Sequence, residues 1–172
     1  MLANDLDRHD LERTERLLAE ADELAAEPYW WLDSIRGDCA MQRGDMIGAI
    51  AAYTTSLAWA HQNGEEHQAL MDLRCLGVCL GRAGHADSAL EAIELIRLHE
   101  EHTGRVGNHT ELAAWLQESH TAALDLAGPV ADAEATARAR AVPISRRVQR
   151  VLDLSARALS TPARDESTPS RT

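Results

Sequence analysis

Residues 99–102 carry the densest group of side chains in the sequence that could bind a metal. His99 and His102 enclose two glutamates, and His109 follows seven residues later. An H-x-x-H spacing lacks the two imidazoles one turn apart with an adjacent glutamate base that H-E-x-x-H provides on a helix. We therefore predict solvated charges at a helix end, with no metal and no cofactor. The remote alternative is a helical enzyme that uses His99, His102 and His109.

The three cysteines are the second candidate for metal or redox chemistry. Cys39, Cys75 and Cys79 are an odd number and lie within helical patterns, which predicts reduced, buried thiols in a cytoplasmic protein. Three thiolates on packed helices, whose axes are about 8–10 Å apart, would converge on one ion only with difficulty. We expect the cysteines to pack as small hydrophobic side chains.

Residue types that several enzyme classes require are missing. All 17 basic residues are arginine, so the chain has neither a phosphate-binding Walker lysine nor a Schiff-base lysine. The glycines 77, 81 and 84 have the wrong spacing for a dinucleotide loop, and no G-x-S-x-G occurs. We predict no catalytic residues and no enzymatic activity. The exclusive use of arginine is typical of a GC-rich genome and suggests an actinobacterial source.

Charge is distributed unevenly along the chain. The overall net charge is −11, but residues 1–137 carry −16 and residues 138–172 carry +5. The acidic body argues against general binding to nucleic acid. We expect the arginines of residues 138–157 to complement this body, with docking on nucleic acid as the alternative. No stretch is apolar enough to be a signal peptide or a membrane span.

The elements that would position these side chains read as helices throughout. Alanine accounts for 30 of the 172 residues and phenylalanine is absent, a composition that favours helix. Apolar residues recur at helical spacing, and Pro28, Gly44, Gly64, Gly84 and Gly128 end successive segments. The predicted helices cover residues 10–27, 30–43, 46–63, 65–82 and 85–102, with three more after residue 108. From residue 160 to 172 the chain has few apolar residues and is predicted to be disordered.

A repeat of 40 residues is the strongest pattern in the sequence. Gly44 corresponds to Gly84, and Tyr53 to Ile93. Four further pairs share this offset: Gly37 with Gly77, Cys39 with Cys79, Ala49 with Ala89 and Ala52 with Ala92. Small residues at fixed positions are expected where paired helices cross closely. A fixed period of this length indicates a stacked helical array.

These residues resemble the tetratricopeptide repeat (TPR), in the 40-residue form found in sensor arrays of large bacterial transcription activators. The resemblance implies an all-α solenoid over residues 1–159, with repeats at 31–63 and 71–102, a degenerate repeat at 110–142 and a capping helix at 143–159. It also implies a protein- or peptide-binding function, as an adaptor or as the sensing domain of a transcriptional regulator.

In such arrays the first helix of each repeat lines a partner-binding groove. Matching the register selects Trp31, Ser34, Asp38, Gln42, Arg74, Val78 and Arg82. Asp38 and Val78 stand where binders of chaperone tails have asparagine, so this ligand is not implied.

The helix predicted at 10–27 resembles the second helix of a repeat whose first helix is missing. Its apolar side, with Leu11, Leu18, Ala21 and Ala25, would then need a partner surface. A homodimeric scaffold is therefore the alternative function.

Overall fold

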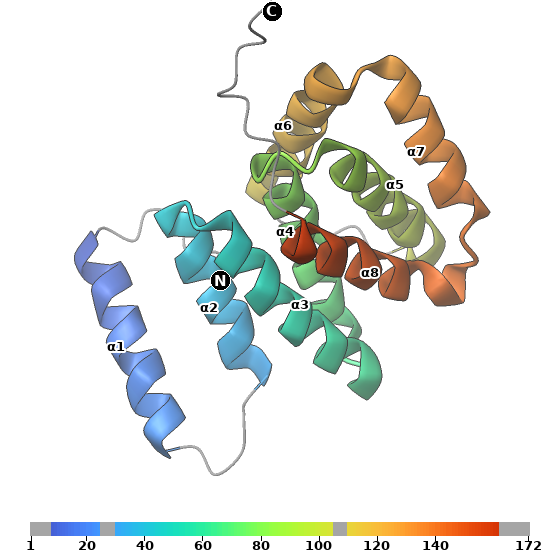
Figure 1. Cartoon of the computed structure of the whole chain (residues 1–172). Helices are drawn as coiled ribbons and strands as arrows, with labels where there is room; N and C mark the ends of the chain where they lie inside the picture. Colours follow the sequence, from blue (N-terminus) through green and yellow to red (C-terminus); the bar gives the residue numbers. More distant parts are fainter. Residues whose placement is uncertain (1–7, 25–29, 105–109, 162–172) are drawn as a thin grey trace, which may run out of the picture.

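The computed structural model describes residues 8–24, 30–104 and 110–161. All regular secondary structure in these ranges is helical, and the helices pack against one another (Figure 1). The helices are α1 (Arg8–Leu24), α2 (Trp30–Arg43), α3 (Met46–Asn63), α4 (Glu66–Arg82), α5 (Ala86–Thr103), α6 (Thr110–Ala127), α7 (Pro129–Ala141), a 3₁₀ turn η1 (Ile144–Arg146) and α8 (Arg147–Ser160). The predicted all-helical class is confirmed for this part of the chain. The disorder predicted for residues 160–172 is wrong at Ser160, which is the last residue of α8, and residues 162–172 fall outside the described ranges.

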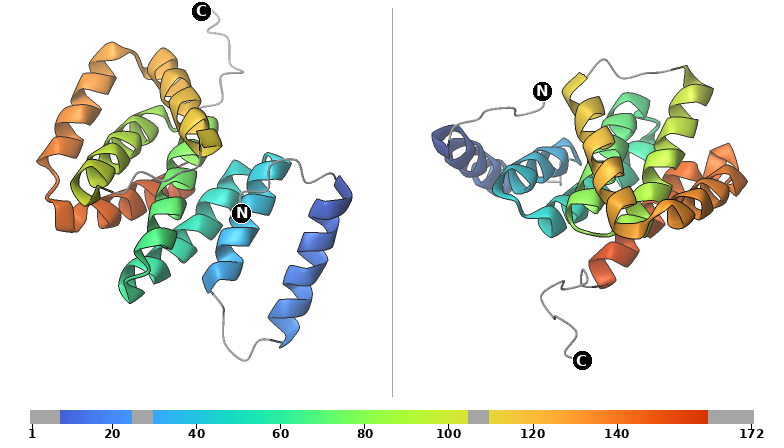
Figure 2. Two further views of the ribbon diagram at one scale, coloured as in Figure 1. Left: turned by 180° about the vertical axis from the view of Figure 1, so that it is seen from behind. Right: turned by 90° about the horizontal axis from the view of Figure 1, so that it is seen from above.

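The first four helices form a row in which each packs against the next (Figures 1 and 2). Each connection from α2 to α5 is a tight turn closed by a glycine with positive φ. Gly44 and Gly84 have φ of 79° and 78°, and the next pair, Gly64 and Gly104, have 73° and 65°. These are left-handed conformations that glycine adopts without steric cost. The backbone thus repeats at the same 40-residue period as the sequence.

Close helix crossings occur at the glycines of the repeat. A Cβ on Gly37 would lie 2.7 Å from ring atoms of Tyr53, and a Cβ on Gly77 would lie 2.9 Å from Leu116 and 3.1 Å from Ile96. Tyr53, Leu76, Leu80 and Leu95 form part of the main core, which takes buried residues from α2 to α8. The absence of a side chain at Gly37 therefore lets α2 approach α3.

We predict that Gly37→Ala destabilises the protein more than Gly77→Ala. The Tyr53 ring is fully buried and cannot turn away, whereas the ends of Leu116 and Ile96 can rotate. Overpacking of this kind costs about 1–3 kcal/mol. Chemical denaturation of both variants measures the difference in the free energy of unfolding. Equal losses in the two variants would show that the Tyr53 ring is not the cause of the destabilisation.

The third pair of helices departs from the first two. Gly128 has φ of 84° and is followed at once by Pro129 at the start of α7, whereas α3 and α5 each begin two residues after their glycine. Helix α6 packs on α4 and α5, and α7 packs on α5 and α6. The residues predicted as a degenerate repeat therefore do form a helix–turn–helix.

Helix α8 does not cap the end of the row. It lies against α3, α4 and α5 (Figure 1), and its buried side chains Val148, Val151 and Leu154 join the main core. The expected terminal cap at 143–159 is wrong in its position, because an amphipathic helix packs wherever an apolar surface remains uncovered. Here that surface lies between α3 and α5.

The predicted apolar side of the first helix is covered within the chain. Leu18 is buried in a small second core with Leu32 and Cys39 of α2, and Leu11 and Ala21 pack against it. The prediction of an unpartnered side is therefore wrong for Leu11, Leu18 and Ala21, while Ala25 lies outside the described residues. None of the helices in the described ranges is long and apolar enough to cross a membrane.

Candidate functional site

The groove expected from the repeat register does not form as one surface. Arg74 is 2% exposed and its Nε donates to Glu100 at 2.5 Å, between α4 and α5. Val78 is fully buried, and its carbonyl accepts from Ser119 of α6 at 3.4 Å. These two residues face packed neighbours, so the expectation that they contact a partner is corrected.

The α2 residues of the expected groove are divided between the interior and the surface. Ser34 and Asp38 are half-buried and bond to groups of α3 and α4: Ser34 Oγ donates to Asp72 at 3.0 Å, and Asp38 accepts from the Tyr53 hydroxyl at 2.5 Å. Trp31 is 46% exposed, and Gln42 is half-buried. Of the predicted set, Arg82 alone reaches the pocket described below.

Asp72 is the centre of a polar cluster that the sequence reading missed. Its fully buried carboxylate accepts hydrogen bonds from Ser34 at 3.0 Å, Ser56 at 2.6 Å and Gln68 at 2.9 Å. Burial raises the pKa of Asp72 to about 6 despite these bonds. An aspartate on the apolar side of α4, in phase with Leu76 four residues later, was the sequence signal that could have located it.

We predict that the Asp72 carboxyl makes the protein more stable in mild acid than at neutral pH. Because its folded pKa of about 6 lies above the ordinary 3.8, the folded state binds the proton more tightly, and stability rises as pH falls from above 6 towards 4. Relative to Asp72→Asn, the wild type should gain about 2 kcal/mol between pH 8 and pH 4.5. Urea unfolding across this range measures the gain, with exposed Asp125→Asn as the control. Parallel pH profiles for wild type and Asp72→Asn would refute it.

The cysteines occupy the interior as predicted. All three are buried and free, and burial raises the pKa of Cys79 to about 12 and that of Cys75 well above its ordinary value. These thiols are therefore held in the protonated, unreactive form. No three histidine, cysteine or acidic side chains converge on a metal position in the described ranges, from which His109 is absent.

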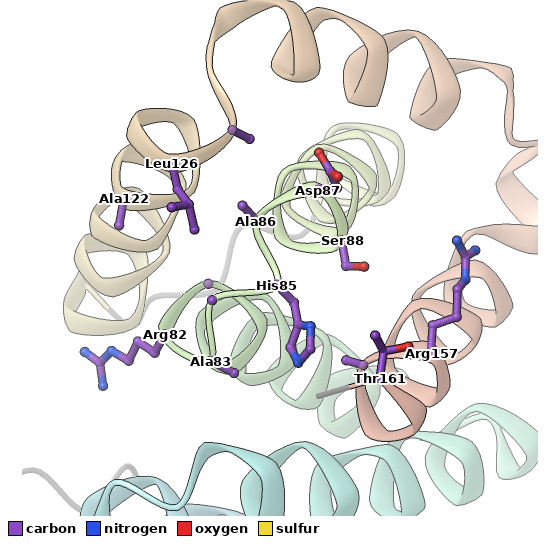
Figure 3. Close-up of a pocket in the computed structure, with 14 residues that line it drawn as sticks. Arg82, Ala83, His85, Ala86, Asp87, Ser88, Ala122, Leu126, Arg157 and Thr161 are labelled. Atoms are coloured by element: carbon purple, nitrogen blue, oxygen red, sulfur yellow. The ribbon is translucent and has the colours of Figure 1, made fainter. Parts of the chain in front are cut away.

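A pocket of described residues lies where the α4–α5 turn faces the ends of α6 and α8. We call it the turn pocket; it has a volume of about 930 Å³. The end of α4 supplies Arg82, the turn itself His85 and the first turn of α5 Ser88 (Figure 3). Helix α6 supplies Ala122 and Leu126, and α8 supplies Arg157. Gly84 shapes the side of the pocket that the α4–α5 turn forms, because its positive φ reverses the chain and places the N-terminus of α5 at the pocket.

Two arginines make the turn pocket attractive to anions. Arg82 and Arg157 lie on opposite sides of it (Figure 3), both exposed, and neither pairs with a carboxylate of the described chain. Arg82 stacks over Trp115 at 5.1 Å, which fixes its stem. His85 lies between them with its Nε2 buried and without a partner in this part of the chain, and burial lowers its pKa. Asp87 is the acidic lining residue.

The remaining arginines of residues 138–157 mostly bind the acidic body. Arg138 and Arg150 both donate to the buried Glu91, at 2.7 and 2.5 Å, and Arg147 donates to the Leu98 carbonyl at 2.6 Å. Arg140 lies 3.7 Å from Glu94. The expected complementation of acidic groups is therefore seen for Arg138, Arg140 and Arg150. Together with the bond from Arg147, these contacts tie α7 and α8 to α5.

No known protein family, curated protein or solved structure matches this chain.

Proposed function

We propose that this chain is a non-catalytic, peptide-binding helical-repeat module of the TPR kind, which acts as an adaptor or as the sensing domain of a bacterial transcriptional regulator. The observation that carries the proposal is the repeat itself, seen in the sequence and again in the backbone of the turns at Gly44 and Gly84. Stacked helix pairs of this type present extended surfaces to other proteins.

The turn pocket is the place where such a peptide would bind. It combines apolar walls from Leu126 and Ala122 with cationic side chains on two sides, the mixture that orients a ligand within a largely apolar site. Arg82 and Arg157 have no carboxylate partner in the described chain, on a protein whose net charge is −11. An extended peptide with acidic side chains or a free carboxylate would satisfy both guanidinium groups.

Selection from a displayed library of random peptides tests the proposal. The bait is the full chain, compared with Ala122→Trp, which places a large ring in the pocket, and with Ala114→Trp, an exposed position on the same helix outside the pocket. Wild type and Ala114→Trp should enrich acidic peptides that Ala122→Trp does not retain. Failure of the wild type to enrich any consensus, or equal enrichment on all three baits, would contradict it.

A further inference from the structure

The chain leaves its last helix at the edge of the turn pocket. Thr161 follows α8 directly and lines the pocket, as does Arg157 one turn before it (Figure 3). The backbone of Thr161 is extended, with φ −124° and ψ 116°, as expected of a residue that precedes a proline. Residues 162–172, which we call the C-terminal segment, lie outside the described ranges. Because this segment is bonded to Thr161, it starts at a wall of the pocket.

The charges of the C-terminal segment are the opposite of those in the pocket. Residues 164–166 read Arg-Asp-Glu and carry one positive and two negative charges. The pocket carries two positive charges and one negative charge, which are the guanidinium groups of Arg82 and Arg157 and the carboxylate of Asp87. In the described ranges, neither arginine pairs with a carboxylate and Asp87 pairs with no cation. All three groups of the pocket can therefore be matched by this short stretch.

The segment is also long enough to cross the pocket. Asp165 and Glu166 follow Thr161 by four and five residues, a span of at most about 13–18 Å in an extended chain. A pocket of about 930 Å³ is about 10 Å across if it is compact. Successive side chains of an extended chain point to opposite faces. Two adjacent acidic residues can thus meet arginines that lie on opposite sides of the pocket (Figure 3).

We infer that the C-terminal segment occupies the turn pocket of its own chain, with Asp165 and Glu166 on Arg82 and Arg157, and that a partner peptide binds by displacing it. The inference rests on the proposed function, because it assigns a competitor to the same site. Weak contacts are sufficient for this competition, since a short tether gives an effective concentration in the millimolar range. The segment therefore sets the affinity that an acidic partner must exceed.

Disulfide formation in the full chain tests the contact without any added peptide. Ser167→Cys is combined either with Ala122→Cys, inside the pocket, or with Ala114→Cys, exposed and about two turns earlier on the same helix. The native thiols are buried and do not compete. The disulfide with Ala122→Cys should form at least about fivefold faster, because binding concentrates the segment at the pocket. Adding Asp165→Asn and Glu166→Gln should remove this difference. Equal rates at the two positions, or a product linked between two chains, would overturn the inference.

Fluorescence anisotropy with an acidic peptide selected on the wild type tests the displacement. Asp165→Asn with Glu166→Gln should raise the affinity of the full chain for this peptide by several-fold to about tenfold, because a competitor at millimolar effective concentration is lost. Glu118→Gln with Asp153→Asn is the matched control, since it removes the same two charges at exposed positions outside the pocket, and it should bind like the wild type. Unchanged affinity in the first variant would overturn the competition. If no peptide is retained by any bait, the proposed function fails, and the disulfide rates still decide whether the segment occupies the pocket.

Discussion

Replacing Arg138 and Arg150 together with alanine should lower the free energy of unfolding by about 3–5 kcal/mol. Both guanidinium groups donate to Glu91, whose side chain is 3% exposed. Burial alone would raise the pKa of Glu91, but the bonds from Arg150 and Arg138 hold it below its ordinary value. Without them an ionised carboxylate would remain in the core with no cation. Leaving one charge of a buried pair without its partner destabilises the folded state strongly.

Adding Glu91→Leu to the double variant should recover most of that loss. The triple variant has no buried charge, and replacing a buried ionic group by apolar side chains of similar size is often neutral or stabilising. Arg97→Ala is the control, because the carboxylates that Arg97 bonds, Glu94 and Glu101, are 14% and 58% exposed against 3% for Glu91, and exposed pairs contribute less than about 1 kcal/mol. Unfolding in guanidinium chloride measures the free energy of unfolding of the double variant, the triple variant and Arg97→Ala. A loss below 1 kcal/mol in the double variant would show that the triad does not hold α7 and α8 on α5.

Reversing the charges of both arginines at the turn pocket should lower the affinity for an acidic peptide, selected on the wild type, by about two orders of magnitude or more. Charge-assisted hydrogen bonds contribute about 1.5–3 kcal/mol each, and every 1.4 kcal/mol is tenfold in affinity. The variant is Arg82→Glu with Arg157→Glu. Both side chains are exposed, so the fold should persist, apart from the loss of the Arg82–Trp115 contact, which contributes about 0.5–1 kcal/mol.

Fluorescence anisotropy with the labelled peptide measures this change. Arg146→Glu is a control with a single charge reversal, since Arg146 is exposed and does not line the pocket. This variant should reduce the affinity for the peptide only slightly. A peptide with glutamine in place of glutamate should bind the wild type as weakly as the acidic peptide binds the double variant. If the double variant binds the peptide as tightly as the wild type and remains helical, the ligand does not use these arginines.

The sequence was sufficient for the local structure of this protein. Helix and turn positions follow from apolar spacing and from glycines such as Gly44 and Gly84, because these features act within a few residues. The 40-residue repeat also predicted close helix crossings at its small residues, and Gly37, where the Tyr53 ring packs, lies at one of them. Burial of the cysteines followed from the same periodicity.

Only the tertiary structure decided which helix faces remained exposed. Arg74 has the spacing of a groove residue, yet it is buried because Glu100 of α5 lies against it. Helix α8 carries an apolar stripe that indicates burial but not a position, and its packing on α3 and α5 pairs Arg150 with Glu91, 59 residues away. The turn pocket likewise needs α8 in that place, because Arg157 lines it. Contacts over such separations depend on the shape and charge of surfaces that form only when the helices pack, so a periodic pattern within one helix cannot specify them.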